Sequence, residues 1–129
     1  MNPPPFDPLY GVSADYRAKV LALATSGELM ERLQAKVPQA KFVKAFNSIG
    51  NAFMVKPAFQ PTPTMFICGD DDGAKATVTE ILTAFGWHTA DMGGVQSARP
   101  IEALCQLWCV RGMLKNDWPH ALRWLDLPT

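Results

Sequence analysis

The residues that could do chemistry in this 129-residue chain gather where three predicted strands end. Asn47 closes the segment K-A-F-N, with Lys44 inside the same strand, while Gly69–Asp70 and Met92–Gly94 follow the other two strands. Ligands of open α/β sheets bind at the carboxyl ends of the strands. These three places are therefore the candidate ligand contacts.

The sequence contains no glycine pattern of the kind that holds the phosphates of a nucleotide. Neither G-x-G-x-x-G nor G-x-x-x-x-G-K-[ST] occurs in it. Gly69 and Gly73 lie at a strand end and a helix start, but Asp70–Asp72 between them would repel phosphate. The three aspartates are better interpreted as caps of the following helix. We therefore predict that the chain alone binds a dinucleotide weakly or not at all.

Other catalytic and metal-binding patterns give no stronger signal. His88 and His120 stand alone, without an H-E-x-x-H or C-x-x-C pattern, so no metal site is predicted. Cys105 and Cys109 share one face of a predicted helix, on an apolar stripe, and are expected to pack there as small hydrophobic residues. No G-x-S-x-G elbow supports a serine nucleophile, although a Ser/His/Asp set assembled in space stays open.

Composition narrows the class of protein and its surroundings. Twelve basic and twelve acidic residues give a formal net charge of zero, so nothing draws the chain toward nucleic acid or anionic lipid. No apolar run approaches the roughly 20 residues that cross a bilayer. The first eight residues show no secretory signal, and three cysteines are too few for a disulfide framework. We expect a cytoplasmic protein without a nucleic-acid or membrane partner.

The chain is long enough for one domain, which is preceded by an arm. Residues 1–25 form a proline-rich arm followed by an uncertain segment over 14–24, which fits either a helix or a strand. A capping box, T-x-x-E, then opens a helix over 26–37 that a proline ends. The domain itself is predicted over 26–129.

Strands and helices are expected to alternate along this domain. Apolar runs predict strands over Lys41–Asn47, Thr64–Asp70 and Trp87–Asp91. A helix between the last two strands ends at Gly86, which makes one parallel βαβ unit. Pro100 is expected to open a longer helix, and Pro119 a short last one. The fold class is α/β, with a partial Rossmann-like, mainly parallel sheet of about three to four strands flanked by helices.

The order of the motifs resembles one family. V-K-A-F-N, G-D-D-x-x-A-K and A-R-x-x-E follow one another within roughly residues 26–115. Together they make the chain similar to the second half of the NADP oxidoreductase, coenzyme F-420-dependent family. The fold of these dinucleotide-binding proteins also occurs in the cytosolic domain of the STEAP ferric reductases. The family begins with a G-x-G-x-x-G half, so the resemblance implies a C-terminal half-domain without the part that holds the NADP phosphates.

The resemblance also implies site residues and cofactors. Asn2 and Pro3 match a loop that lies near the nicotinamide in the family. Ala45, Phe46 and Asn47 match a strand whose end faces the hydride-transfer cleft. The border of the deazaflavin or substrate pocket is matched by Gly93, Gly94, Ala98, Arg99 and Glu102. In such enzymes the cofactors carry the chemistry, so the resemblance implies NADP and a deazaflavin rather than an acid–base pair.

Three functions follow as hypotheses. The chain could be a truncated NAD(P)-dependent oxidoreductase domain that transfers hydride with a partner chain supplying the N-terminal Rossmann half. It could instead be a non-catalytic binding or assembly module, or a small-molecule-binding protein. A homo-oligomer is also expected, because the strand over 42–46 lacks its Rossmann neighbour unless residues 17–24 replace it, and an uncovered edge recruits another chain.

Overall fold

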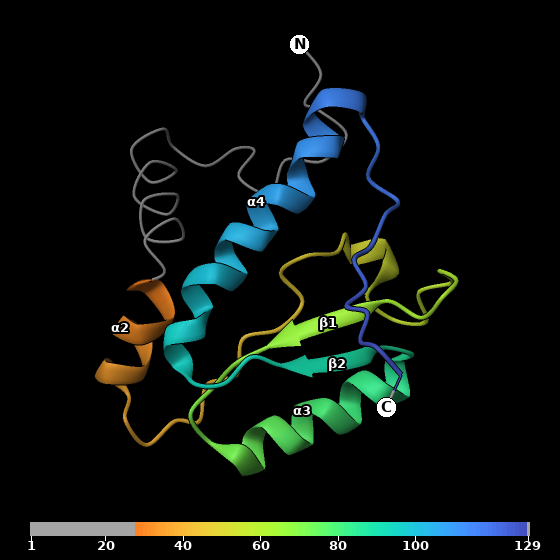
Figure 1. The fold of residues 1–129 in the computed structure, drawn as a ribbon. Coiled ribbons are helices and arrows are strands. Elements are labelled where there is room, and N and C mark those ends of the chain that lie inside the picture. The colour runs from red at the N-terminus through yellow and green to blue at the C-terminus, as the bar shows by residue number, and fades with distance from the viewer. Residues whose placement is uncertain (1–27, 129) are drawn as a thin grey trace.

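The computed structural model describes residues 28–128, in which helices and strands alternate. The predictions for Asn2, Pro3 and the rest of region 1–25 lie outside the described residues. The regular elements are α2 (Glu28–Lys36), β1 (Thr64–Ile67), α3 (Asp72–Phe85), β2 (His88–Asp91) and α4 (Ala98–Lys115), shown in Figure 1. Two single turns of 3-10 helix lie over Asn51–Phe53 and Val95–Ser97.

The predicted βαβ unit is confirmed. β1 and β2 are parallel neighbours, with Thr64 opposite His88, and α3 connects them along one side of the sheet (Figure 1). The Asp71 side chain caps α3 by accepting the Ala74 N–H at 2.7 Å. Gly86 ends the helix with a φ of 98°, a left-handed conformation that suits glycine.

β1 is buried on both faces and divides the core into two clusters. Met65 and Ile67 contribute to a cluster on the α3 side, together with Leu82. Phe66 and Cys68 contribute to a second cluster with residues of α2 and α4. Because both faces are covered, the strand is a continuous apolar run, and this is the pattern that predicted it.

The predicted strand over Lys41–Asn47 is not formed. The segment makes one isolated antiparallel bridge, in which Lys44 and Cys68 exchange backbone hydrogen bonds of 2.9 and 3.3 Å. The Phe42 N–H instead donates to Gln34 Oε1, and Phe46 has a left-handed φ of 61°, which ends the extended conformation. The described sheet therefore has two parallel strands rather than three to four.

Other predicted elements differ in the structure, beginning with β1, which ends at Ile67 rather than at Asp70. α4 begins at Ala98, so Pro100 lies inside the first turn, where its missing N–H leaves no intrahelical bond unmade. The short helix expected from Pro119 is absent from the described residues. Leu122 O accepts the Thr64 N–H at 2.8 Å, and the Trp124 N–H donates to Thr64 Oγ1 at 3.0 Å. Thr64, at the start of β1, therefore holds the segment that follows α4. We call this segment, residues 116–128, the last segment.

Candidate functional site

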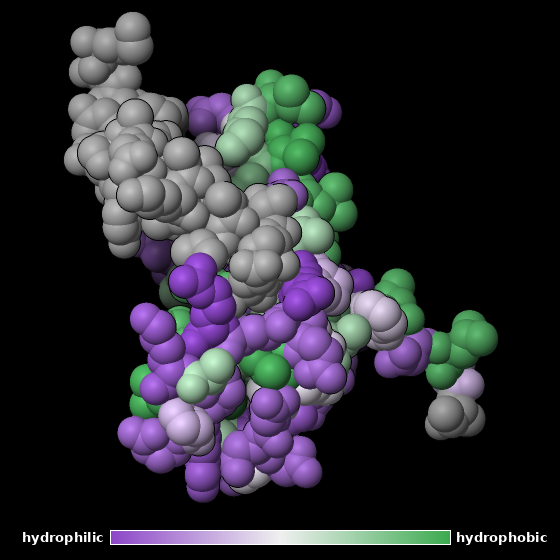
Figure 2. Space-filling model, turned by 90° about the vertical axis from the view of Figure 1, so that its left-hand side faces the viewer, coloured by the Kyte–Doolittle hydropathy of each residue, from purple (hydrophilic) through white to green (hydrophobic). Residues whose placement is uncertain are grey.

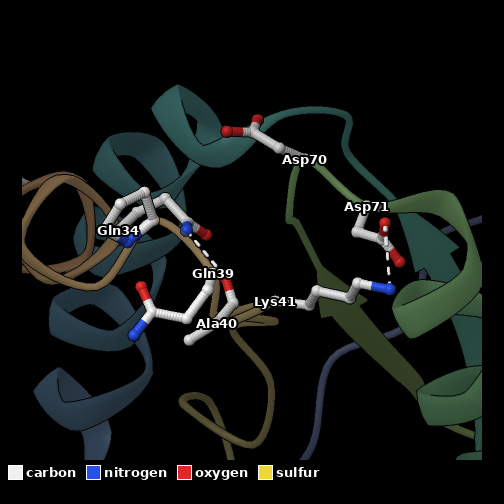
Figure 3. A pocket seen from close by; sticks show the side chains of 7 residues that line it. Gln34, Gln39, Ala40, Lys41, Asp70 and Asp71 are labelled. Atoms are coloured by element: carbon white, nitrogen blue, oxygen red, sulfur yellow. Dashed lines mark hydrogen bonds and ion pairs between the residues drawn. The ribbon is translucent and has the colours of Figure 1, made fainter.

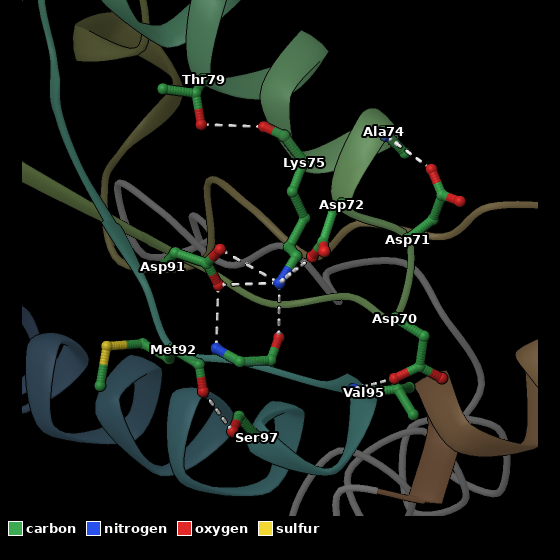
Figure 4. A network of polar contacts seen from close by, with 11 residues as sticks. Asp70, Asp71, Asp72, Ala74, Lys75, Thr79, Asp91, Met92, Val95 and Ser97 are labelled. Carbon is green, nitrogen blue, oxygen red and sulfur yellow. Dashed lines mark hydrogen bonds and ion pairs between the residues drawn. The ribbon is translucent and has the colours of Figure 1, made fainter.

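The carboxyl ends of β1 and β2 bring two of the three predicted contact points together. The Gly69 N–H donates to Gly93 O at 3.0 Å, and the Val95 N–H donates to Asp70 Oδ1 at 2.9 Å. Gly69–Asp70 and Asp91–Ser97 thus form one continuous surface, which we call the carboxyl edge (Figure 4). Ligands of α/β sheets bind at such an edge, so it is the candidate functional site.

Lys75 of α3 fixes the carboxyl edge. Its side chain is 9% exposed, and Nζ donates to Asp91 Oδ1 at 3.1 Å and to Gly93 O at 3.3 Å (Figure 4). Asp91 Oδ1 also accepts the Gly93 N–H at 2.9 Å. The Gly93–Gly94 loop is therefore held at Gly93, through both the backbone N–H and the carbonyl. Sequence reasoning missed Lys75 and Asp91, although A-K in the first turn of α3 and an aspartate at the end of β2 were visible signals.

The charges of this network are mutually stabilised. The hydrogen bond from Lys75 to Asp91 raises the pKa of Lys75 despite partial burial. Burial alone would raise the pKa of Asp91, but the Gly93 N–H and Lys75 outweigh it and hold that pKa below 3.8. The ionised form of Asp91 therefore stabilises the native state above about pH 4, and this contribution disappears as the pH falls through the lowered pKa.

The lowered pKa of Asp91 gives a pH-dependent prediction for Asp91→Asn. The variant should be less stable than the wild type at pH 7, and the difference should shrink as the pH falls below 3.8. Denaturant unfolding between pH 7 and pH 2.5 measures it. Asp126→Asn, which removes a carboxylate that bonds the Trp124 indole in the last segment, is the matched control. A stability difference for Asp91→Asn that is constant with pH would contradict the assignment.

A polar cleft of about 560 Å³ opens beside the carboxyl edge (Figure 3). Its lining includes Gln34, Gln39, Lys41, Asp70 and Asp71. Lys41 Nζ lies 3.9 Å from Asp71 Oδ1 and is largely exposed, so the cleft presents an ammonium, carboxylates and carboxamides to solvent. Such groups can hold a polar ligand. No sequence motif indicated the two glutamines, which come from α2 and the turn after it.

Asn47, the third predicted contact, is not brought to the carboxyl edge. The Lys44–Cys68 bridge is antiparallel, so the residues that follow Lys44 run away from the carboxyl ends of β1 and β2. Asn47 Nδ2 donates to Ile101 O of α4 at 2.5 Å, and Oδ1 is buried without a hydrogen-bond partner. Ala45 and Phe46 pack against the cluster on the α3 side.

The predicted pocket residues of α4 connect that helix to its neighbours. Glu102 forms an ion pair with Lys44, and the two side chains are only 17% and 18% exposed. Burial lowers the pKa of Lys44. Arg99 makes two hydrogen bonds to Glu31 of α2, at 2.7 and 3.0 Å, which lower the pKa of Glu31. Their role at the border of a substrate pocket stays a prediction.

The two cysteines of α4 are free thiols, and one of them has a perturbed pKa. Cys105 and Cys109 are half-buried, and burial raises the pKa of Cys105 to about 11, so its thiol stays protonated at neutral pH. In residues 28–128 no group of His, Cys, Asp or Glu side chains is arranged to hold a metal ion. No helix in this part of the chain has the length and apolar character to cross a bilayer.

Comparison with solved structures identifies the fold. The chain matches a crystal structure from Arthrobacter sp. FB24, of a protein described as an F420-dependent NADP reductase, with a TM-score of 0.70 and 28% identity. The chain shares part of this reductase fold. The match covers 76% of this chain and 46% of the reductase, so the chain spans less than half of that protein.

A curated relative supports the same resemblance. Over 74 residues the chain is 38% identical to metalloreductase STEAP3 of Rattus norvegicus, a stretch that covers 57% of this chain and 15% of the relative. No protein-family model matches the sequence. The two matches confirm the similarity to reductases that the ordered motifs V-K-A-F-N, G-D-D-x-x-A-K and A-R-x-x-E indicated.

Proposed function

We propose that this chain is part of an NADP-dependent oxidoreductase that transfers hydride between the nicotinamide and a second carrier or substrate. The observation that carries the proposal is the shared reductase fold, at a TM-score of 0.70. The 129 residues contain no G-x-G-x-x-G pattern, so the dinucleotide phosphates must be held by a Rossmann half outside them.

In this proposal the carboxyl edge positions a reactant. Hydride transfer is carried out by the cofactors, and the protein holds them in the reacting geometry. The bonds from Lys75 and Asp91 hold the Gly93–Gly94 loop in one conformation before any ligand arrives. The matched protein is described as F420-dependent, which supports a deazaflavin or a small substrate as this reactant.

NADPH titration tests where the phosphates are held. Calorimetry on the chain alone should give a dissociation constant weaker than about 10 µM, because the sequence lacks the G-x-G-x-x-G loop whose backbone donors hold a pyrophosphate. A Rossmann polypeptide from the same genome that carries G-x-G-x-x-G should restore binding when it is mixed with the chain. NADPH oxidation, with F420 or a ferric chelate as acceptor, should then require both components. Tight binding by the chain alone would contradict this division of roles.

Self-association is the second proposal, and it also fits an assembly module without catalysis. Leu107, Met113 and Leu114 of α4 are 63%, 77% and 76% exposed, and Figure 2 shows hydrophobic side chains over the upper end of this helix. Exposed apolar side chains that gather on one helix favour a protein–protein interface. The zero net charge opposes self-association only weakly.

Light scattering across a concentration series tests the oligomer. The wild type should exceed the monomer mass of 14.2 kDa, and Leu107→Glu with Leu114→Glu should return the mass to that value. Ile81→Glu is the control, since Ile81 is an exposed apolar residue of α3, at 44% exposure. A constant mass of 14.2 kDa for the wild type would defeat the proposal.

A further inference from the structure

A second cavity, of about 350 Å³, lies between α4, β1 and the segment that follows α4. It shares no lining residue with the polar cleft beside the carboxyl edge. Phe66 of β1 lines it, Pro100 and Leu104 come from α4, and Leu122 and Trp124 come from the last segment. The cavity is thus built from parts of the chain that are distant in sequence.

The lining of this cavity is apolar and aromatic. The rings of Phe66 and Trp124 lie edge to face, with centroids 6.0 Å apart and planes at 69°. Phe66 is buried at 6% exposure, whereas Trp124 is 49% exposed, which makes Phe66 an inner wall and Trp124 part of the mouth. Aromatic edges beside aliphatic side chains favour a planar apolar ring.

The polar side chains that line the cavity are already engaged. Ser97 Oγ donates to Met92 O at 2.6 Å, and Arg123 donates to Thr62 O. Arg123 is exposed, so water screens its guanidinium charge, and the rest of the lining contains no charged side chain. This lining favours a neutral molecule, whose polar substituents can remain in water at the mouth.

Hydrogen bonds hold the walls in place without a ligand. Thr64 binds the last segment twice, through its N–H to Leu122 O and through its Oγ1 to the Trp124 N–H. The Met92 N–H donates to Ile67 O at 2.8 Å, which fixes the side of the cavity that follows β2. A cavity that is formed in advance spares the ligand the cost of ordering its walls.

We propose that this cavity is a binding site for a small, neutral, planar aromatic molecule of one or two fused rings. An apolar cavity of about 150 Å³ takes a benzene ring, so a space about twice as large accommodates a bicyclic one. The cavity is separate from the polar cleft, although Met92 and Ser97 in its lining belong to the carboxyl edge. The proposal does not depend on the chain being part of an oxidoreductase.

The experiment uses 2-naphthol as probe and measures binding by calorimetry and by methyl NMR of the whole chain. Binding should saturate with a dissociation constant below about 1 mM, as expected for an apolar ligand of this size. The shifted methyl signals should be those of Leu104, Leu122 and Met92. Leu104→Trp fills the cavity from its α4 wall and should weaken binding at least tenfold.

Val110→Trp is the matched control, because it adds a tryptophan further along α4 at a residue that is 43% exposed and does not line the cavity. It should leave the dissociation constant within twofold of the wild type. If Leu104→Trp does not fold, the shift map of the wild type decides alone. Non-saturating binding, shifts centred on Leu107, Met113 and Leu114, or unchanged affinity in folded Leu104→Trp would each overturn the proposal.

Discussion

Replacing Glu102 by glutamine should destabilise the native state by about 3 kcal/mol, the lower end of the range for broken buried ion pairs. The substitution leaves the Lys44 ammonium, 18% exposed, without its carboxylate partner. Taking a charge out of water is costly, and the lowered pKa of Lys44 shows that burial already disfavours its charged form. Urea unfolding at neutral pH measures the loss.

Two further variants separate the unpaired charge from other effects of the substitution. Lys44→Met with Glu102→Met removes both charges and should recover most of the stability, because an apolar pair of similar volume replaces the ion pair. Glu31→Gln breaks the more exposed pair with Arg99, whose side chain is 57% exposed, and should cost much less. Equal losses for Glu102→Gln and Glu31→Gln would show that the Lys44–Glu102 pair is not special.

The effect of Glu102→Gln should also depend on pH in a defined direction. Burial already lowers the pKa of Lys44 below 10.5 in the wild type, and loss of the Glu102 carboxylate should lower it further. Between the two lowered values the native variant then binds fewer protons than the native wild type. The stability of the variant should therefore rise toward that of the wild type as the pH approaches 10.5. A difference that grows with pH would contradict this sign.

The elements that the sequence predicted correctly are those whose signals are local. Asp71 and Gly86 specify the ends of α3 through backbone conformation and capping, and these were visible without a structure. β1 was predicted because its burial on both faces leaves a continuous apolar run. Such features depend on a few neighbouring residues, and no distant contact overrides them here.

The incorrect predictions depended on contacts between distant residues. An apolar run cannot reveal that Phe46 takes a positive φ or that Gln34 captures the Phe42 N–H, and these contacts replaced the expected strand. The segment after α4 is held by Thr64 of β1, which a proline at a potential helix start could not indicate. Local preference yields to tertiary pairing in both cases.

In the candidate site too, features with local signals were predicted and features that depend on distant residues were missed. The Gly93–Gly94 loop was predicted from its position after a strand, and the structure places it at the carboxyl edge next to Gly69. Lys75 was missed because helical periodicity does not tell which polar side chain turns toward a loop. The partnership of Glu102 with Lys44 was missed because the sequence shows each residue without its distant neighbour.

Replacing Gly69 by alanine should destabilise the protein by about 1–3 kcal/mol, as expected for an added methyl group in a packed interior. A Cβ at this buried position would lie 2.6 Å from the backbone oxygen of Phe42, well inside van der Waals contact. A backbone atom cannot swing aside as a side chain can, so the segment that holds the Lys44–Cys68 bridge has to move. Thermal or urea unfolding measures the loss, and hydrogen exchange of the Lys44 amide should become faster.

Gly50→Ala is the matched control for this substitution. A Cβ at Gly50 would lie 3.9 Å from the Trp108 ring, an ordinary contact, and the φ of −74° and ψ of 151° suit alanine. This variant should be as stable as the wild type or gain about 0.4–1 kcal/mol, because alanine restricts the unfolded chain. If Gly69→Ala unfolds at the same denaturant concentration as Gly50→Ala, the close approach of Phe42 to Gly69 does not constrain the fold, and the glycine serves only the turn that follows β1.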